Sequence, residues 1–290
     1  MIGFFSRRKE KKARLASYVK PKWAQLNINH KNDGPAPDIV MDFPTLEKKG
    51  FLTPDILSGD LARDYNLVKR RLFQRLSYFG KGGVVQDRAQ RVREQKPCPV
   101  VLLSSGSPGE GKTFSSCNLA LSLALDERLK VLLIDADLAK PSTPGVFDYD
   151  ENKPGLFEQL IEPDKPVDRF ILKSAPLPIN ILPAGQATSS PAQLLASQVM
   201  VDLIDDLATQ YRNYDIILMD GPPLLATTEA AALAPLADEV VIVVGTGETT
   251  VEEIGSSLDF LGGMDHVSML MNRIYFQEAR PSSYPYGDAA

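Results

Sequence analysis

From Val100 onward, short apolar runs alternate with longer segments in which apolar residues recur every three or four positions. The runs have the length of buried strands and the longer segments have the period of helices, a pattern typical of a parallel sheet covered on both faces. The expected strands are Val100–Ser104, Val131–Asp135, Ile179–Pro183, Asp215–Asp220, Glu239–Val244 and Val267–Met271. The expected helices are Thr113–Asp126, Leu156–Ile161, Pro191–Tyr211, Thr228–Leu236 and Val251–Leu261. The pattern therefore predicts an α/β fold with a doubly wound, mostly parallel sheet.

The part of the chain before Val100 has a different character. Residues 1–50 mix basic clusters with Asn, Asp, Pro and Gly and show no sustained period, which predicts a flexible arm. An apolar stripe over Leu57–Tyr78 predicts a helix. We expect four parts: the arm, a helical extension and linker over 51–96, the α/β domain over 97–274, and a flexible tail over 275–290.

The charge of the chain is distributed unevenly. The formal net charge is −5, which gives no reason to expect nucleic-acid binding. Residues 1–23 carry eight Lys or Arg and one acid, a balance of +7, so the rest carries −12. This basic arm could contact anionic lipid, although a basic tail without a membrane role is an equal alternative. Cys98 and Cys117 cannot form a disulfide framework, and no apolar run approaches the roughly 18–20 residues of a membrane span, so a reducing cytoplasmic setting is expected.

A glycine-rich motif follows the first strong strand. Residues 106–113 satisfy the pattern G-x-x-x-x-G-K-[ST], with an apolar run before it and an amphipathic helix after it. Such a P-loop directs backbone amides and the positive end of a helix at phosphates. Lys112 would neutralise the terminal phosphates and Thr113 would bind Mg²⁺. The expected nucleotide-binding residues are Gly106, Ser107, Pro108, Gly109, Glu110, Gly111, Lys112, Thr113 and Phe114, and the predicted ligand is ATP with Mg²⁺.

Three acidic residues lie at the ends of two expected strands. Asp135 and Asp137 follow the run at 131–134, and Asp220 follows the run at 214–219. Ligands of open α/β sheets bind at the carboxyl ends of the strands, so all three could point toward the phosphates. One of them could instead cap a strand–helix junction.

Three segments carry a family resemblance. Residues 107–113 (SPGEGKT), 132–138 (LLIDADL) and 214–223 (YDIILMDGPP) resemble the ATP-site motifs of the bacterial tyrosine kinases of capsule and exopolysaccharide assembly, which are P-loop proteins. The similarity covers about 100–272. Residues 64–70 (DYNLVKR) are similar to the helix before the kinase core in the subgroup that accompanies exosortase-type exopolysaccharide clusters.

The resemblance implies a cytoplasmic protein-tyrosine autokinase that uses Mg-ATP. It assigns Lys112, Asp135 and Asp137 to catalysis, with Asp135 accepting the proton of the attacking tyrosine or supporting magnesium. Thr113, Asp137 and Asp220 would hold Mg²⁺. It also implies that Asn272 contacts adenine, although an Asn that ends a strand is often a turn residue.

The resemblance also implies acceptor tyrosines in the tail, phosphorylated by neighbouring subunits. Tyr284 and Tyr286 lie in the accessible segment SSYPYG, whereas Tyr275 is close to the last strand and could be packed. The partners implied in the same way are a separate inner-membrane activator or chain-length determinant and further copies of the chain. The family's ring of subunits is one such assembly, and it would lie at the inner face of the membrane.

Two positions depart from family patterns. The ring-forming helix of the family offers a glutamate and two arginines, where this chain has Arg63, Asn66 and Lys69. Partition and division-site ATPases share the expected fold and usually have a second lysine early in the P-loop, where this chain has Ser107. A nucleotide-switched positioning ATPase of that kind is the alternative function, and Ser107 argues against it.

Overall fold

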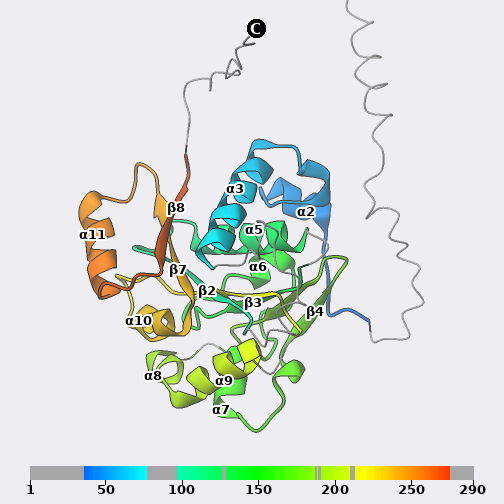
Figure 1. Cartoon of the computed structure of the whole chain (residues 1–290). Coiled ribbons are helices and arrows are strands. Elements are labelled where there is room, and N and C mark those ends of the chain that lie inside the picture. Colours follow the sequence, from blue (N-terminus) through cyan, green and yellow to red (C-terminus); the bar gives the residue numbers. More distant parts are fainter. Residues whose placement is uncertain are drawn as a thin grey trace, which may run out of the picture. The chain divides into compact units, whose positions relative to one another are not determined.

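The computed structural model describes residues 36–76, 97–125, 129–186, 188, 191–209 and 213–274, and the described residues from Pro37 to Ile274 form one compact unit. In these residues, eight strands form one sheet in the order β1-β4-β5-β3-β6-β2-β7-β8 (Figure 1). All neighbouring strands are parallel except β4 and β5. The strands are β1 Ile39–Val40, β2 Val100–Ser105, β3 Val131–Asp135, β4 Leu172–Ala175, β5 Ile179–Leu182, β6 Ile216–Asp220, β7 Glu239–Gly245 and β8 Val267–Asn272.

Helices cover both faces of this sheet (Figure 1). One face is covered by α7, α8, α9 and α10, which pack on β2, β3 and β6. The opposite face is covered by α2, α3, α5 and α6. The helices are α2 Phe43–Lys48, α3 Asp60–Arg75, α5 Lys112–Ala124, α6 Pro144–Phe147, α7 Leu156–Ile161, α8 Pro191–Leu195, α9 Gln198–Thr209, α10 Glu229–Leu233 and α11 Val251–Phe260, with short 3-10 turns at Pro54–Ile56, Val167–Arg169 and Ala234–Leu236. The doubly wound α/β fold predicted from the sequence is confirmed.

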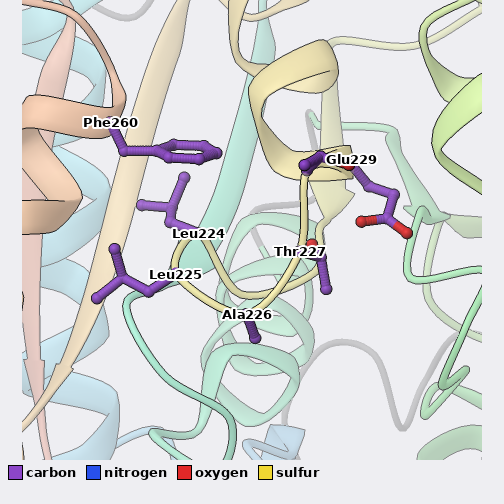
Figure 2. Close-up of a pocket in the computed structure, with 7 residues that line it drawn as sticks. Leu224, Leu225, Ala226, Thr227, Glu229 and Phe260 are labelled. Carbon is purple, nitrogen blue, oxygen red and sulfur yellow. The ribbon is translucent and has the colours of Figure 1, made fainter.

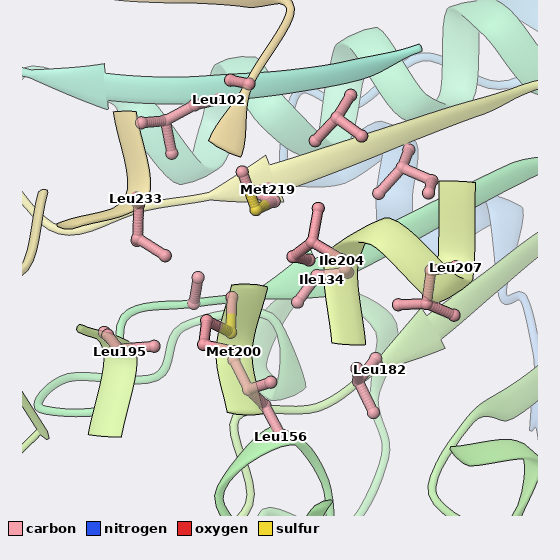
Figure 3. Close-up of a cluster of buried hydrophobic side chains, with 14 of the residues drawn as sticks. Leu102, Ile134, Leu156, Leu182, Leu195, Met200, Ile204, Leu207, Met219 and Leu233 are labelled. Carbon is pink, nitrogen blue, oxygen red and sulfur yellow. The ribbon is translucent and has the colours of Figure 1, made fainter. Parts of the chain in front are cut away.

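The alternation of side chains along each central strand separates two apolar cores. Leu102, Ile134 and Met219 point into one core, where they meet Met200 and Leu233 of the helices (Figure 3). Their chain neighbours point to the opposite face, toward α5. Since every residue of β2, β3, β6 and β7 is buried, these strands read as continuous apolar runs.

The expected helix Pro191–Tyr211 is interrupted. The structure has α8 and α9 in its place, separated by Ala196 and Ser197. The Ser197 hydroxyl donates to the Leu194 carbonyl at 2.6 Å and accepts from the Met200 amide at 3.3 Å. A serine in this position caps a new helix start, and the apolar period alone does not reveal it.

The flexible arm predicted over residues 1–50 is too long, because residues 36–50 are part of the folded unit. Within 36–50, β1 pairs with β4, and α2 begins after Asp42, whose side chain accepts from the Thr45 amide at 3.3 Å. Ile39 and Leu46 are buried in the core. This stretch therefore belongs to the folded unit, and Pro44 and Asp42 serve as helix-start residues rather than as signs of a loop. Residues 1–35, which carry the basic cluster, lie outside the described residues.

Helix α3 packs across α5, with Tyr65, Leu72 and Phe73 buried between them. At its end, Arg75 Nε donates to the two carboxylate oxygens of Glu239 at 3.0 and 3.2 Å. Lys69 Nζ donates to the Ser122 carbonyl on α5 at 3.2 Å. The helix is thus fastened to the α/β domain rather than separate from it.

Candidate nucleotide site

The P-loop connects β2 to α5 and depends on two glycines in the left-handed region. Gly109 has φ of 91° and Gly111 has φ of 93°. A Cβ on Gly111 would lie 2.1 Å from Asn272 Nδ2, whereas nothing lies within 4 Å of one on Gly109. Gly111 is therefore fixed by both backbone conformation and space, and Gly109 by conformation alone.

Glu110 braces the loop from inside. Its carboxylate is buried, accepts from the Ser107 amide at 2.8 Å, and also accepts from the hydroxyl of Thr249. The Ser107 hydroxyl donates to Glu253 on α11 at 3.1 Å. Turning the Glu110 carboxylate inward removes a negative charge from the surface that faces phosphates and leaves the backbone amides for them. The motif pattern did not reveal this bracing role, or the part played by Thr249.

The end of β8 holds the loop from the other side. Asn272 Nδ2 donates to the Glu110 carbonyl at 2.9 Å, and Arg273 Nη2 donates to the Gly109 carbonyl at 2.5 Å. Arg273 also pairs with Glu248. We call these contacts the β8 clamp. Arg273 carried no motif signal, since its partners lie far away in the sequence.

The strand-end acids meet at the start of α5. Asp135 and Asp220 are register partners on β3 and β6, and both continue the alternation that points toward α5. Lys112 Nζ pairs with Asp137 at 2.8 Å. One turn further along α5, the Ser116 hydroxyl donates to Asp220 Oδ1 at 2.9 Å. The structure thus brings together Lys112 and all three acids predicted from the sequence.

Burial and mutual repulsion dominate the electrostatics of this group. Burial, with the charge of Asp220 next, raises the pKa of Asp135 to about 7, against hydrogen bonds from Thr143 and Ser142 that lower it. Burial also raises the pKa of Asp220, against the charge of Lys112, which lowers it. Burial alone would lower the pKa of Lys112, but Asp220 and Asp137 together raise it. One cation faces three carboxyl groups, a balance that a divalent cation would correct.

The donor set fits a metal shared with phosphates. Asp220 Oδ2 is buried and makes no hydrogen bond, so it has an unused acceptor position. The described residues contain no group of three or more His, Cys, Asp and Glu side chains arranged to hold a metal by themselves. Magnesium typically takes one or two carboxylates with water and substrate phosphates, and this arrangement suits it.

Phe114, a predicted nucleotide-binding residue, lies within the described residues, whereas the predicted acceptor tyrosines do not. The Phe114 ring packs on Phe51, with ring centroids 5.1 Å apart, so only its backbone amide remains available for a phosphate. Tyr275, Tyr284 and Tyr286 lie outside the described residues.

An open pocket lies beside the P-loop (Figure 2). It has a volume of about 490 Å³ and is lined by residues 224–229 and Phe260 of α11. The Leu225 amide donates to the Gly106 carbonyl at 3.0 Å, which ties the pocket wall to the loop. The lining is mainly apolar and contains none of the predicted phosphate-binding groups, so this pocket is distinct from the nucleotide site.

A strand, a glycine-rich loop and a helix that begins with Lys112, with aspartates on the adjacent strand ends, define a P-loop NTPase. This fold binds a nucleotide together with a divalent metal. Residues 100–267 match the model of a family described as AAA domain. None of the helices in the described part of the chain has both the length and the hydrophobicity of a membrane span.

Similar proteins narrow this class. The chain is 32% identical over 188 residues to the putative tyrosine-protein kinase EpsB of Ralstonia nicotianae, covering 65% of this chain and 24% of EpsB. It is 34% identical over 161 residues to the tyrosine-protein kinase YwqD of Bacillus subtilis, covering 56% of this chain and 65% of YwqD. The chain thus spans about a quarter of EpsB and under two thirds of YwqD.

Among solved structures, the kinase domain of VpsO is 30% identical, with a TM-score of 0.56 over 74% of this chain and 97% of that domain. The kinase domain of the Escherichia coli tyrosine kinase ETK superposes with a TM-score of 0.62 at 22% identity, which supports the fold. The chain belongs to the AAA domain family and, within it, to the bacterial tyrosine kinases.

Proposed function

We propose that this chain is a protein-tyrosine autokinase that transfers the γ-phosphoryl group of ATP to tyrosines of its own C-terminal tail. The observation that carries the proposal is the convergence of Lys112, Asp135 and Asp220 at the start of α5. Relatives that are named tyrosine-protein kinases support it.

Each residue of the site has a chemical role in this proposal. The P-loop amides and Lys112 hold the phosphates and balance their charge. Magnesium, held by Thr113, Asp137 and Asp220, would supply further charge neutralisation. Asp135 accepts the proton of the tyrosine hydroxyl, which is a weak nucleophile while protonated. Adenine lies near Asn272, whose amide has a second hydrogen beyond the one given to Glu110.

The acceptors in this proposal are Tyr284 and Tyr286, with Tyr275 as a third candidate. The cellular role is regulation of exopolysaccharide or capsule polymerisation or export. A separate inner-membrane activator and further copies of the chain, with a ring as one arrangement, are the expected partners. We place the protein in the cytoplasm at the inner face of the membrane, where the basic residues of 1–23 could contact anionic lipid.

A positioning ATPase is the competing function. The positioning ATPases typically have a lysine at the position of Ser107, and this lysine reaches the nucleotide of the partner subunit. Here the Ser107 hydroxyl is bonded within the chain to Glu253. This contact favours the kinase, and an assay must separate the two.

The test is phosphotyrosine formation by the purified chain in Mg-ATP, with and without a candidate activator fragment, measured by intact mass alongside phosphate release. We expect phosphotyrosine in the wild type, none in Lys112→Met, and normal levels in Lys130→Met, which removes an exposed lysine at the opposite end of β3. A chain ending at Arg280 should lose most of the signal. Phosphate release without phosphotyrosine would instead support the ATPase, and full signal in the shortened chain would refute Tyr284 and Tyr286 as acceptors.

A further inference from the structure

The two oxygens of the Asp135 carboxylate have unequal surroundings. Oδ2 accepts from the Thr143 hydroxyl at 2.7 Å and from the amides of Thr143 and Ser142 at 3.1 and 3.2 Å. Oδ1 is approached only by the Asp137 amide, at 3.4 Å, among the described residues. Three donors therefore hold one oxygen, while the other is nearly free.

Thr143 is in turn held by Tyr149. The two hydroxyl oxygens are 2.5 Å apart, and Thr143 is fully buried. A threonine hydroxyl has one hydrogen, and at Thr143 that hydrogen points to Asp135. Tyr149 must then be the donor to Thr143. Burial raises the pKa of the Tyr149 phenol, so this hydroxyl keeps the hydrogen that it donates.

The local backbone explains how this chain of hydrogen bonds forms. Thr143 precedes α6, and Asp148 ends that helix with φ of 54°. The Asp148 amide donates to the Pro144 carbonyl at 3.0 Å, closing a single helical turn. This turn brings Tyr149 back to Thr143, six residues earlier. The contact thus arises from one compact segment beside the end of β3.

We propose that Thr143 and Tyr149 are positioning residues that fix the Asp135 carboxylate so that Oδ1 is the atom that receives the acceptor's proton. This proposal rests on the proposed kinase function. In the step, the proton of the tyrosine hydroxyl passes to Oδ1 while the tyrosine oxygen forms a bond to the γ-phosphorus. The bond between the γ-phosphorus and the β–γ bridging oxygen breaks, and ADP leaves with that electron pair.

The orientation matters because phosphoryl transfer depends mainly on placement. A displacement of about 1 Å in a reacting group can reduce a rate by about 10²-fold. With three donors on Oδ2, rotation of the carboxylate would break several hydrogen bonds at once. A purely structural role for Thr143, in which it only secures α6, would affect stability and leave turnover unchanged.

The test compares Thr143→Val, which keeps the shape and removes the hydroxyl, with Thr143→Ser, which keeps the hydroxyl. We expect Thr143→Val to lower kcat by about 10–100-fold with KM for ATP within about twofold. The kcat of Thr143→Ser should stay within about threefold of the wild type. The kcat of Tyr149→Phe should lie between those of Thr143→Ser and Thr143→Val. Thr227→Val is the matched control, because it makes the same exchange at a threonine whose hydroxyl donates to the Pro223 carbonyl and not to Asp135.

Phosphotyrosine formation, phosphate release and thermal unfolding are measured for each variant. Unchanged kcat in Thr143→Val with a lower Tm would overturn the proposal, as would failure of Thr143→Ser to restore kcat. If Thr143→Val does not fold, Tyr149→Phe tests the proposal instead. A wild-type kcat in Tyr149→Phe would then reject the positioning role of the hydrogen bonds from Tyr149 through Thr143 to Asp135. If the wild type releases phosphate without forming phosphotyrosine, the kinase function fails. The same variants would then test whether Asp135 is positioned toward water.

Discussion

The ends of β3 and β6 hold equivalent aspartates in unequal surroundings. Asp135 and Asp220 are register partners, face the same helix and are both fully buried. Yet one oxygen of Asp135 accepts from three donors, whereas one oxygen of Asp220 accepts from the Ser116 hydroxyl and its other oxygen makes no hydrogen bond. Strand pairing places the two carboxyl groups together, and the loops and helices around them make them different.

This difference separates two chemical roles. A carboxylate held rigidly by one oxygen presents the other in a fixed direction, which suits a proton acceptor. A carboxylate with an unused, buried oxygen suits a metal or a water bound to it. Environment, rather than residue type, thereby divides the work between two carboxylates, as it does in other acid–base pairs.

The largest expected effect is on turnover in Asp135→Asn. Removing a general base typically costs about 10²–10⁴-fold, so kcat should fall by that range. The dissociation constant for Mg-nucleotide should change by less than about threefold, because Asp220 still serves the metal. Phosphotyrosine assays and titration with a fluorescent nucleotide measure the two quantities, with exposed Asp168→Asn as the control. Loss of Mg-nucleotide binding in Asp135→Asn would contradict the proposed division of roles, in which Asp135 accepts a proton and Asp220 serves the metal.

Asp220→Asn should show the reverse pattern in binding. We expect the gain in nucleotide affinity that Mg²⁺ provides to shrink by about 10–100-fold, the usual range for residues around a metal. In EDTA the variant and the wild type should bind nucleotide with similar affinity. Titrations with and without Mg²⁺ measure this difference. An equal Mg²⁺ effect in both proteins would argue that Asp220 does not serve the metal.

A smaller effect is expected on the stability of the metal-free protein. With a folded pKa of about 7 against an ordinary 3.8, folded Asp135 retains a proton that the unfolded chain releases. The unfolding free energy of the wild type should therefore fall as pH rises from about 4 to 7. Asp135→Asn removes this penalty, at most about 4 kcal/mol after the hydrogen bonds from Thr143 and Ser142 are counted. With the amide oxygen in the place of Oδ2, the amide nitrogen faces the Asp137 amide and lacks an acceptor, which costs about 1–3 kcal/mol.

We therefore expect Asp135→Asn to be more stable than the wild type by about 1 kcal/mol above pH 7, and this gain to vanish near pH 4. Urea unfolding in EDTA at both pH values measures it. A variant that is less stable than the wild type at pH 8 would show that the amide nitrogen without an acceptor costs more than the buried charge.

The sequence predicts the parts of the molecule whose signals are local. Continuous apolar runs identify β2, β3, β6 and β7 because these strands are buried on both faces. The P-loop is recognisable because its glycines and Lys112 are close in sequence. Strand β1 has only two residues, too few for a period to emerge, and it exists because it pairs with β4 far along the chain. Strand β4 is not predicted because only its first residue, Leu172, is buried, so it lacks the apolar run that identifies its hairpin partner β5.

The details of the site escape sequence analysis for a related reason. The inward turn of Glu110 depends on Thr249, which is 139 residues away, and the β8 clamp joins positions more than 160 residues apart. Thr143 and Tyr149 are close together in sequence, but a Thr and a Tyr six residues apart form no motif. Only the fold shows that a left-handed Asp148 returns one hydroxyl to the other.

The β8 clamp also determines where the tail is tethered. Tyr284 follows Ile274 by ten residues, and an extended chain spans about 3.3–3.6 Å per residue, so Tyr284 reaches at most about 35 Å from this point. A short tether that can span two sites keeps its end at an effective concentration on the order of millimolar around its anchor. A neighbour's tail has only the bulk concentration until copies assemble. The initial rate per molecule in a dilution series therefore tells whether one copy or two carry out the reaction.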